Sequence, residues 1–169
     1  MPYQYKREPL SDEETTCLIN ACESFQEKFI IWILLDTGMR VSELAGLTKQ
    51  NIQWQERRIV VYGKGGKRRI IPMTDRVRKL IENHFTFQDK VGCSVRNIQR
   101  IVKIVANRAS ISKPVCPHSI RHLFAINAIR RGISTRSLMM FLGHDRLTTT
   151  EIYLNLSPED AIREFQNKW

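Results

Sequence analysis

The chain has 169 residues, of which 42% are hydrophobic, which suits one domain with a buried core and excludes a disordered or fibrous chain. It carries 27 Lys and Arg against 17 Asp and Glu, a formal net charge of +10. Residues 1–36 hold only three of the basic residues but seven of the acidic ones, so the rest is strongly basic. This imbalance predicts a surface for a polyanion, nucleic acid ahead of anionic lipid, with a merely soluble basic surface as the alternative.

The N-terminal segment predicts a linker followed by a helix. Residues 1–9 are polar and form the expected linker, which suggests that a further domain precedes it. Ser11 and Glu14 have the spacing of a capping box, so a helix is expected from there to about Cys22. The N-terminus lacks an apolar signal-peptide core, and the longest apolar run, residues 29–35, is too short to span a bilayer. A soluble, intracellular protein is predicted.

Residues 25–36 are apolar nearly all round, which predicts a central buried helix. Gly38 is placed to end that helix. Arg40 follows, and a short helix over VSELAGL would bring Glu43 within one turn of Arg40.

Three short runs rich in β-formers come next, and they are NIQW, RRIVVY and KRRIIPM. Gly63, Lys64, Gly65 and Gly66 join the last two as a hairpin turn that carries a lysine. The runs predict a small three-stranded antiparallel sheet.

Helical signals return after the sheet. Thr74 caps a helix to about Asn83, and Ser94 begins a helix with apolar residues at helical spacing. Pro117 stands just inside the start of a further helix, and Ser134 caps the next. Four cysteines show neither zinc-site spacing nor the density of a disulfide scaffold, so reduced thiols are expected at Cys17, Cys22, Cys93 and Cys116.

The stretch from Pro117 to Tyr153 holds the densest set of reactive side chains. His118 and Arg121 are three residues apart, so a helix puts both on one face at the end that attracts anions. Gly143 closes the helix that starts after Ser134, and His144 follows it. Phosphoryl transfer needs cations on the non-bridging oxygens, an in-line nucleophile and an acid for the leaving oxygen. The sequence has no carboxylate cluster for Mg²⁺ and no phosphate-binding loop, so arginines would take the place of a metal.

Four motifs, TGMRVSEL, GKGGKRR, HSIRH, and LGH with a tyrosine nine residues later, resemble in order and spacing those of the tyrosine recombinases, the phage-integrase family, in particular its Xer-like and archaeal-type integrases. The resemblance implies that Tyr153 attacks a DNA phosphate and forms a 3′-phosphotyrosyl link. It implies that Arg40 and Arg121 clamp the phosphate, that Lys64 protonates the leaving 5′-oxygen, and that His118 assists proton transfer.

The same resemblance gives supporting roles to further residues. His144 would hydrogen-bond the phosphate, and Glu43 would orient Arg40 or its neighbours. The run Lys67, Arg68 and Arg69 is expected to contact the DNA backbone rather than to take part in the chemistry. No metal, cofactor or ATP is implied, because the phosphotyrosyl link conserves the energy of the broken bond.

The resemblance further implies an α+β catalytic domain, mostly helical with the small sheet, over residues 10–169, after a linker over residues 1–9 from a missing N-terminal DNA-binding domain. Double-stranded DNA and other protomers of the same protein in a tetrameric synapse would be its partners, whereas the isolated domain would be monomeric. A cytoplasmic, nucleoid-associated protein of prokaryotic, viral or plasmid origin is expected. The rival functions are DNA relaxation of the type IB topoisomerase kind and a non-catalytic basic DNA-binding module. His84 and His122 are expected to be capping or core histidines.

Overall fold

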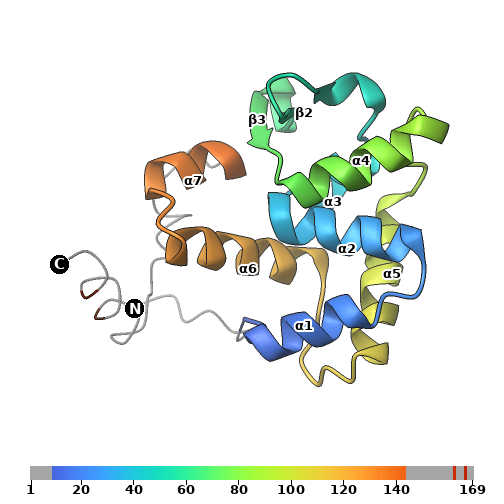
Figure 1. The fold of residues 1–169 in the computed structure, drawn as a ribbon, viewed down its shortest axis with the longest axis vertical. Helices are drawn as coiled ribbons and strands as arrows, with labels where there is room; N and C mark the ends of the chain where they lie inside the picture. Colours follow the sequence, from blue (N-terminus) through green and yellow to red (C-terminus); the bar gives the residue numbers. More distant parts are fainter. Residues whose placement is uncertain (1–8, 144–161, 163–165, 167–169) are drawn as a thin grey trace.

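The computed structural model describes residues 9–143 together with residues 162 and 166. In this part of the chain, helices predominate and surround one small antiparallel sheet, which confirms the predicted α+β class (Figure 1). The elements are α1 (Asp12–Asn20), α2 (Phe25–Thr37), α3 (Val41–Ala45), η1 (Lys49–Asn51), β1 (Ile52–Gln53), β2 (Arg58–Tyr62), η2 (Lys64–Gly66), β3 (Arg68–Pro72), α4 (Asp75–Phe87), α5 (Val95–Arg108), α6 (Pro117–Arg130) and α7 (Thr135–Leu142).

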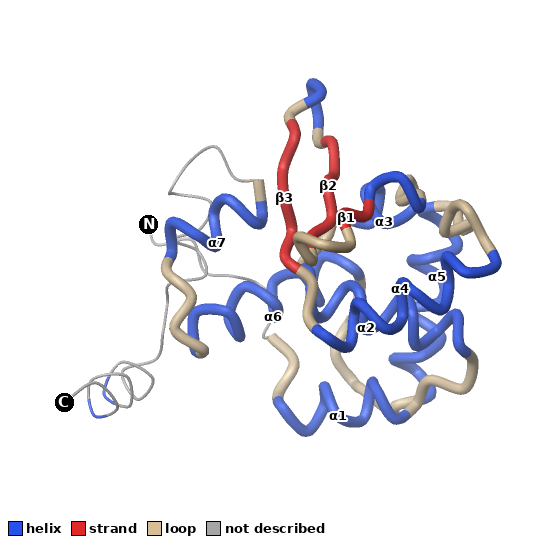
Figure 2. Tube along the Cα trace, turned by 45° about the horizontal axis from the view of Figure 1, so that its top comes forward, coloured by secondary structure: helices blue, strands red, loops and turns tan. Residues whose placement is uncertain are grey.

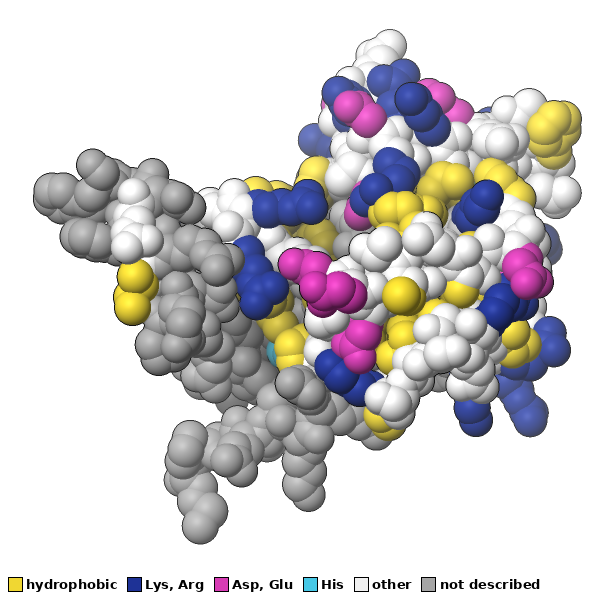
Figure 3. Space-filling view, turned by 60° about the horizontal axis from the view of Figure 1, so that its bottom comes forward, with side chains coloured by type: hydrophobic (Ala, Val, Ile, Leu, Met, Phe, Trp, Pro, Cys, Tyr) yellow, Lys and Arg dark blue, Asp and Glu magenta, His cyan; other side chains and the backbone are white. Residues whose placement is uncertain are grey.

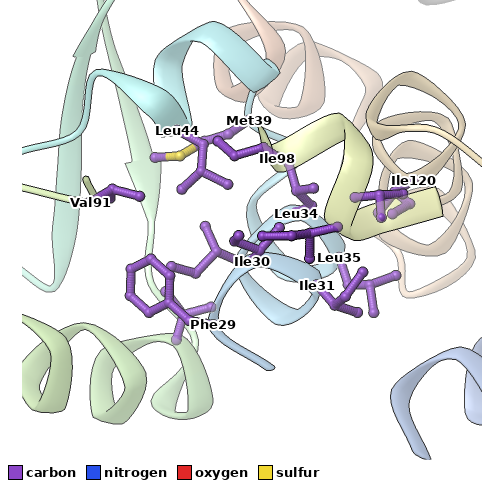
Figure 4. Packing of buried hydrophobic residues seen from close by; sticks show 14 of the residues in the cluster. Phe29, Ile30, Ile31, Leu34, Leu35, Met39, Leu44, Val91, Ile98 and Ile120 are labelled. Carbon is purple, nitrogen blue, oxygen red and sulfur yellow. The ribbon is translucent and has the colours of Figure 1, made fainter. Parts of the chain in front are cut away.

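Helix α2 forms the centre of the hydrophobic core. Its residues Phe29, Ile30, Ile31, Ile33 and Leu34 are almost fully buried, as its nearly continuous apolar sequence predicts (Figure 4). Helices α4, α5 and α6 all pack against it. Burial at roughly 25 cal/mol per Å² of apolar surface makes this layer the main source of the fold's stability. None of the described helices combines the length and the apolar character that a membrane span requires.

Serine and threonine caps begin the helices where the sequence predicts them. The side chains of Ser11, Thr74, Ser94 and Ser134 each accept a hydrogen bond from a backbone N–H in the first turn of their helix. The sequence places the end of α4 about four residues too early, because the helix continues to Phe87. Phe85 is buried in this last turn, so core packing extends the helix past its polar residues.

The sheet has the order β1-β2-β3, with both pairs antiparallel. Strands β2 and β3 form the predicted hairpin, which extends away from the helices (Figure 2). Along β3, Arg69 and Ile71 are buried, whereas Arg68 and Ile70 are exposed. Two neighbouring arginines therefore lie on opposite faces of the same strand.

Helix α7 lies beside β3 at the edge of the molecule and also contacts α6 (Figures 1 and 2). Its buried side chains belong to a second, small hydrophobic cluster of Ala125, Ala128, Leu138 and Leu142. This cluster is separate from the large core around α2. The place where α2, β3, α6 and α7 meet is where the sequence predicts the functional residues.

Candidate active site

The junction between α2 and α3, which carries Gly38 and Arg40, packs against helix α6 through Gly38. Gly38 ends α2 in the left-handed conformation, with φ of 59°. A Cβ atom added there would overlap the ring of Phe124 on α6, so glycine is required both for the backbone and for the close approach of the two helices. Arg40 follows this closely packed glycine by two residues and begins α3 as its N-cap.

Arg40 and Glu43 form a local pair in α3. The Arg40 backbone N–H donates to Oε2 of Glu43 at 2.7 Å, and its Nη1 donates to Oε1 at 3.1 Å. The Glu43 side chain is 3% exposed, whereas that of Arg40 is 41% exposed. The carboxylate thus fixes both the backbone and the guanidinium of Arg40 and leaves the rest of that guanidinium accessible, as the sequence spacing predicts.

Arg69 does not lie where the sequence analysis placed it. Its side chain is only 6% exposed, and Nη2 donates to Oε2 of Glu43 at 2.6 Å. Nη1 donates to the carbonyl oxygen of Phe141 at 2.8 Å. The expectation that Arg69 contacts the DNA backbone is therefore corrected: alternation along β3 turns Arg69 inward, while Arg68 and Lys67 are exposed.

Arg121 is also buried, with 5% of the residue exposed. It donates from Nη1 to the carbonyl oxygen of Gly38 and from Nη2 to that of Leu142, the latter at 2.6 Å. These two bonds fix the orientation of the planar guanidinium of Arg121. His118 is exposed one turn earlier on α6, near the helix N-terminus where Pro117 occupies the first position.

Three consecutive carbonyl groups at the C-terminal end of α7 each accept a hydrogen bond from a different arginine. Arg69 reaches Phe141, Arg121 reaches Leu142, and Arg40 reaches Gly143 at 3.4 Å. The last carbonyls of a helix have no partner within the helix and carry partial negative charge, so cations stabilise this end. Gly143 closes the helix with φ of 64°. The three arginines therefore converge on the C-terminal end of α7, which directly precedes His144 in the sequence.

A groove of about 1100 Å³ lies between the β2–β3 hairpin and α7. The charged residues among its described lining are the cations Arg40, Lys67, Arg68, Arg69 and Arg136, with Glu43 as the carboxylate. A different face of the molecule, shown in Figure 3, has Lys and Arg interspersed with Asp and Glu. The groove therefore concentrates the positive charge that a polyanion requires.

Three of the predicted catalytic side chains are not placed by this geometry. Lys64 stands in the turn of the hairpin, η2, where Gly65 and Gly66 have φ of 75° and 74°, but only its backbone is described. His144 and Tyr153 lie outside the described residues. The structure thus brings together Arg40, Glu43, Arg69 and Arg121.

The remaining histidines are packing residues, as predicted. His84 stacks on Phe29 with ring centroids 4.4 Å apart. His122 is buried, and this burial, together with the nearby His118, lowers the pKa of His122 to about 4. It is therefore neutral near pH 7, which suits a core position.

Sequence reasoning missed the internal role of Arg69 and the basic contribution of Arg136. Ile70 and Ile71 are both apolar, so the hydrophobic pattern of β3 does not reveal which of its faces is buried. Arg136 is the second residue of α7 and belongs to no motif. Only the packing of α7 against β3 identifies these two positions.

Comparison with solved structures defines the class of the fold. The crystal structure of XerA recombinase superposes with a TM-score of 0.83 at 29% identity, covering 95% of this chain and 65% of that one. XerH site-specific recombinase, in a post-cleavage complex with a palindromic difH substrate, superposes with a TM-score of 0.77 at 20% identity, over 94% of this chain and 52% of that one. The described architecture is that of a tyrosine recombinase catalytic domain.

The sequence assigns the family. The model of the phage integrase family matches residues 8–160, so the chain belongs to that family. Tyrosine recombinase XerD of Shewanella oneidensis is 30% identical over 167 residues, which cover 89% of this chain and 53% of XerD. The chain therefore spans about half the length of the curated relatives it matches.

Proposed function

We propose that this chain is the catalytic part of a site-specific DNA recombinase that cuts and rejoins DNA strands through a 3′-phosphotyrosyl intermediate. The observation that carries the proposal is the convergence of Arg40 and Arg121, from distant parts of the sequence, on the end of α7. Both arginines are oriented by carbonyl or carboxylate groups, and such preorganised cations stabilise the charge of a phosphoryl transition state without reorganising during the reaction.

In the proposed reaction, Oη of Tyr153 attacks the scissile phosphorus as its proton is withdrawn with the help of His118. The bond from phosphorus to the 5′-oxygen breaks, and Lys64 supplies the proton that makes the leaving group a 5′-hydroxyl. Arg40, Arg121 and His144 bind the non-bridging oxygens. The 5′-hydroxyl of a partner strand then attacks the phosphotyrosyl link, which releases Tyr153 and completes the exchange.

The proposed substrate is double-stranded DNA seated along the groove. Lys67 and Arg68 are exposed on the hairpin side of the groove, where they would contact phosphates. The buried Glu43 carboxylate holds Arg40 in the lining of the same groove. In XerH the printed substrate is difH DNA, which supports DNA as the partner here. We further propose action with other protomers in a tetrameric synapse, in the cytoplasm at the nucleoid, and residues 1–9 as a linker from an N-terminal DNA-binding domain.

The two rival functions are less well supported. Type IB topoisomerase-like relaxation and a non-catalytic DNA-binding module do not account for the likeness to Xer recombinases along 89% of this chain. A covalent adduct separates the enzymes from the binding module, and strand exchange between two sites separates recombination from relaxation.

The test is the replacement Tyr153→Phe, which removes the attacking oxygen and keeps the ring. With a nicked suicide substrate that carries a candidate half-site, the wild-type chain is expected to give a protein–DNA adduct on a denaturing gel. The Phe variant is expected to bind the same DNA with unchanged affinity and to give no adduct. The replacement Tyr5→Phe, at a tyrosine of the predicted N-terminal linker, is the matched control and should retain the adduct. Adduct formation by Tyr153→Phe would exclude Tyr153 as the nucleophile.

A further inference from the structure

Arg69 occupies an unusual position for a cation in a basic, DNA-facing hairpin. Its side chain is 6% exposed and connects β3 to two other elements, α3 and the end of α7. It donates to Oε2 of Glu43 on α3 at 2.6 Å and to the carbonyl oxygen of Phe141 on α7, 72 residues away in sequence, at 2.8 Å. Among the described residues, its Nε is buried without a hydrogen-bond partner.

Stability alone does not require an ion pair at this position. Burial lowers the pKa of Arg69, and the Glu43 carboxylate acts against that effect, which is the balance expected of a desolvated ion pair. Such pairs are often matched or exceeded in stability by apolar residues of similar volume. The unpartnered Nε adds a further cost. The specific property of arginine at this site is its planar fork, which donates to two acceptors at once in a fixed geometry.

The two acceptors of Arg69 lie in different elements of the site: Glu43 is on α3, and Phe141 is on α7. Glu43 also receives the backbone N–H and Nη1 of Arg40, so the carboxylate is shared by the two arginines. Phe141 is near the end of α7, and a Cβ atom on Gly143 would lie 2.8 Å from Cδ of Arg69. Arg69 therefore packs directly against the last residue before His144.

We propose that Arg69 is a positioning residue: it joins the Glu43–Arg40 pair to the C-terminal end of α7, so that the phosphate-binding arginine and the segment leading to His144 keep one relative geometry. This inference rests on the proposed function. It assigns to Arg69 an effect on the rate of cleavage rather than on the binding of DNA. Displacement of about 1 Å between reacting groups can cost roughly 100-fold in rate, so this effect is measurable.

The experiment compares Arg69→Met and Arg69→Lys with two other arginine variants in the full chain. Arg69→Met fills the site without charge, and it is expected to lower the single-turnover rate of adduct formation at saturating DNA by about 10-fold to 100-fold, with the affinity for DNA within about twofold of wild type. Arg69→Lys keeps the charge next to Glu43, but an ammonium group lacks the planar geometry that donates to both acceptors at once. Its rate of adduct formation is therefore expected to lie between those of wild type and Arg69→Met.

The controls separate positioning from affinity and from stability. Arg68→Ala, on the opposite face of β3, is expected to weaken DNA binding and to reduce the slope of log affinity against log salt by about one unit. Arg76→Met removes another arginine held by a carboxylate, that of Asp36; neither residue lines the groove, so the cleavage rate is expected to stay unchanged. A loss of affinity in Arg69→Met like that of Arg68→Ala would overturn the positioning role.

Hydrogen exchange supplies a readout that does not depend on catalysis. In Arg69→Lys, the amides of α7 are expected to exchange faster while those of α5 keep the wild-type rate. Unchanged exchange in α7 would overturn the proposal even if no DNA is cleaved. If α7 exchanges faster in the variant but the wild-type chain gives no adduct, Arg69 does hold α7 to the Glu43–Arg40 pair, whereas the proposed function is excluded. If Arg69→Met fails to fold, Arg69→Lys carries both measurements, and a wild-type cleavage rate in that variant would likewise contradict the proposal.

Discussion

Helices α2 and α7 are held in the molecule by different kinds of interaction. Helix α2 is enclosed by α4, α5 and α6 and buries a continuous apolar surface in the large core. Helix α7 contributes only Leu138 and Leu142 to a small separate cluster, and its C-terminal carbonyls are held by three arginines. The packing of α2 therefore rests on apolar burial, whereas the placement of α7 also depends on charged side chains. Arg121 connects the two helices, because it donates to the carbonyl oxygens of both Gly38 and Leu142.

The largest expected effect tests the core side of this comparison. Phe29→Ala removes a ring that is 1% exposed, and it is expected to lower the free energy of unfolding by about 4 kcal/mol, because burial is lost and a cavity remains. Urea denaturation followed by circular dichroism measures the change. Phe87→Ala is the control, since that ring is 79% exposed and its loss should cost less than about 0.5 kcal/mol. Similar losses in the two variants would contradict the central role of α2.

The next effect depends on pH and arises on α6, between the two regions. Burial lowers the pKa of His122 to about 4, from an ordinary value near 6.5. The unfolded chain therefore binds the proton more tightly, so stability is lost as pH falls from about 6.5 to 4, by roughly 3 kcal/mol in all. Unfolding free energies of wild type and His122→Gln across this range give the contribution as a difference. Parallel pH curves would show that His122 does not titrate as its burial requires.

A smaller effect is expected where the core meets the site. Gly38→Ala forces a side chain into a left-handed backbone and against Phe124, which should cost about 2 kcal/mol of stability. The double variant Gly38→Ala/Phe124→Ala removes the overlap but not the backbone strain. In a double-mutant cycle measured by thermal unfolding, the double variant should therefore lose less stability than the sum of the losses of the two single variants. Additive losses would place the cost of Gly38→Ala in the backbone alone.

The smallest effect sharpens the comparison at α7. Ser134 caps this helix, and Ser134→Ala is expected to cost about 1 kcal/mol, as is Ser94→Ala at the start of α5. Because α7 is outside the large core, the first loss should appear as faster local exchange of α7 amides and the second as a lower global stability. Global destabilisation by both variants would mean that α7 folds as one unit with the core.

The sequence predicts most of the local structure and part of the site. The caps at Ser94 and Ser134, the hairpin and the contact between Arg40 and Glu43 follow from short-range patterns, and the structure has all of them. The inward position of Arg69 depends on which face of β3 is covered by α7, a contact between distant segments. Short-range sequence patterns carry no information about such contacts. They therefore do not show that, in the run Lys67, Arg68 and Arg69, the first two residues are exposed and the third is buried.

The long sequence separations within the arginine cluster also bear on when the site forms during synthesis. The bonds from Arg69 to Phe141, Arg121 to Gly38 and Arg40 to Gly143 join residues 72, 83 and 103 positions apart. Contacts of this kind close long loops and form late in folding. A nascent chain that emerges N-terminal end first can form its hairpin and much of the α2 packing before α7 has left the ribosome. Arg40 and Arg121 then lack the carbonyl oxygens at the end of α7 to which they donate, so the arginine cluster is complete only when the whole domain has emerged.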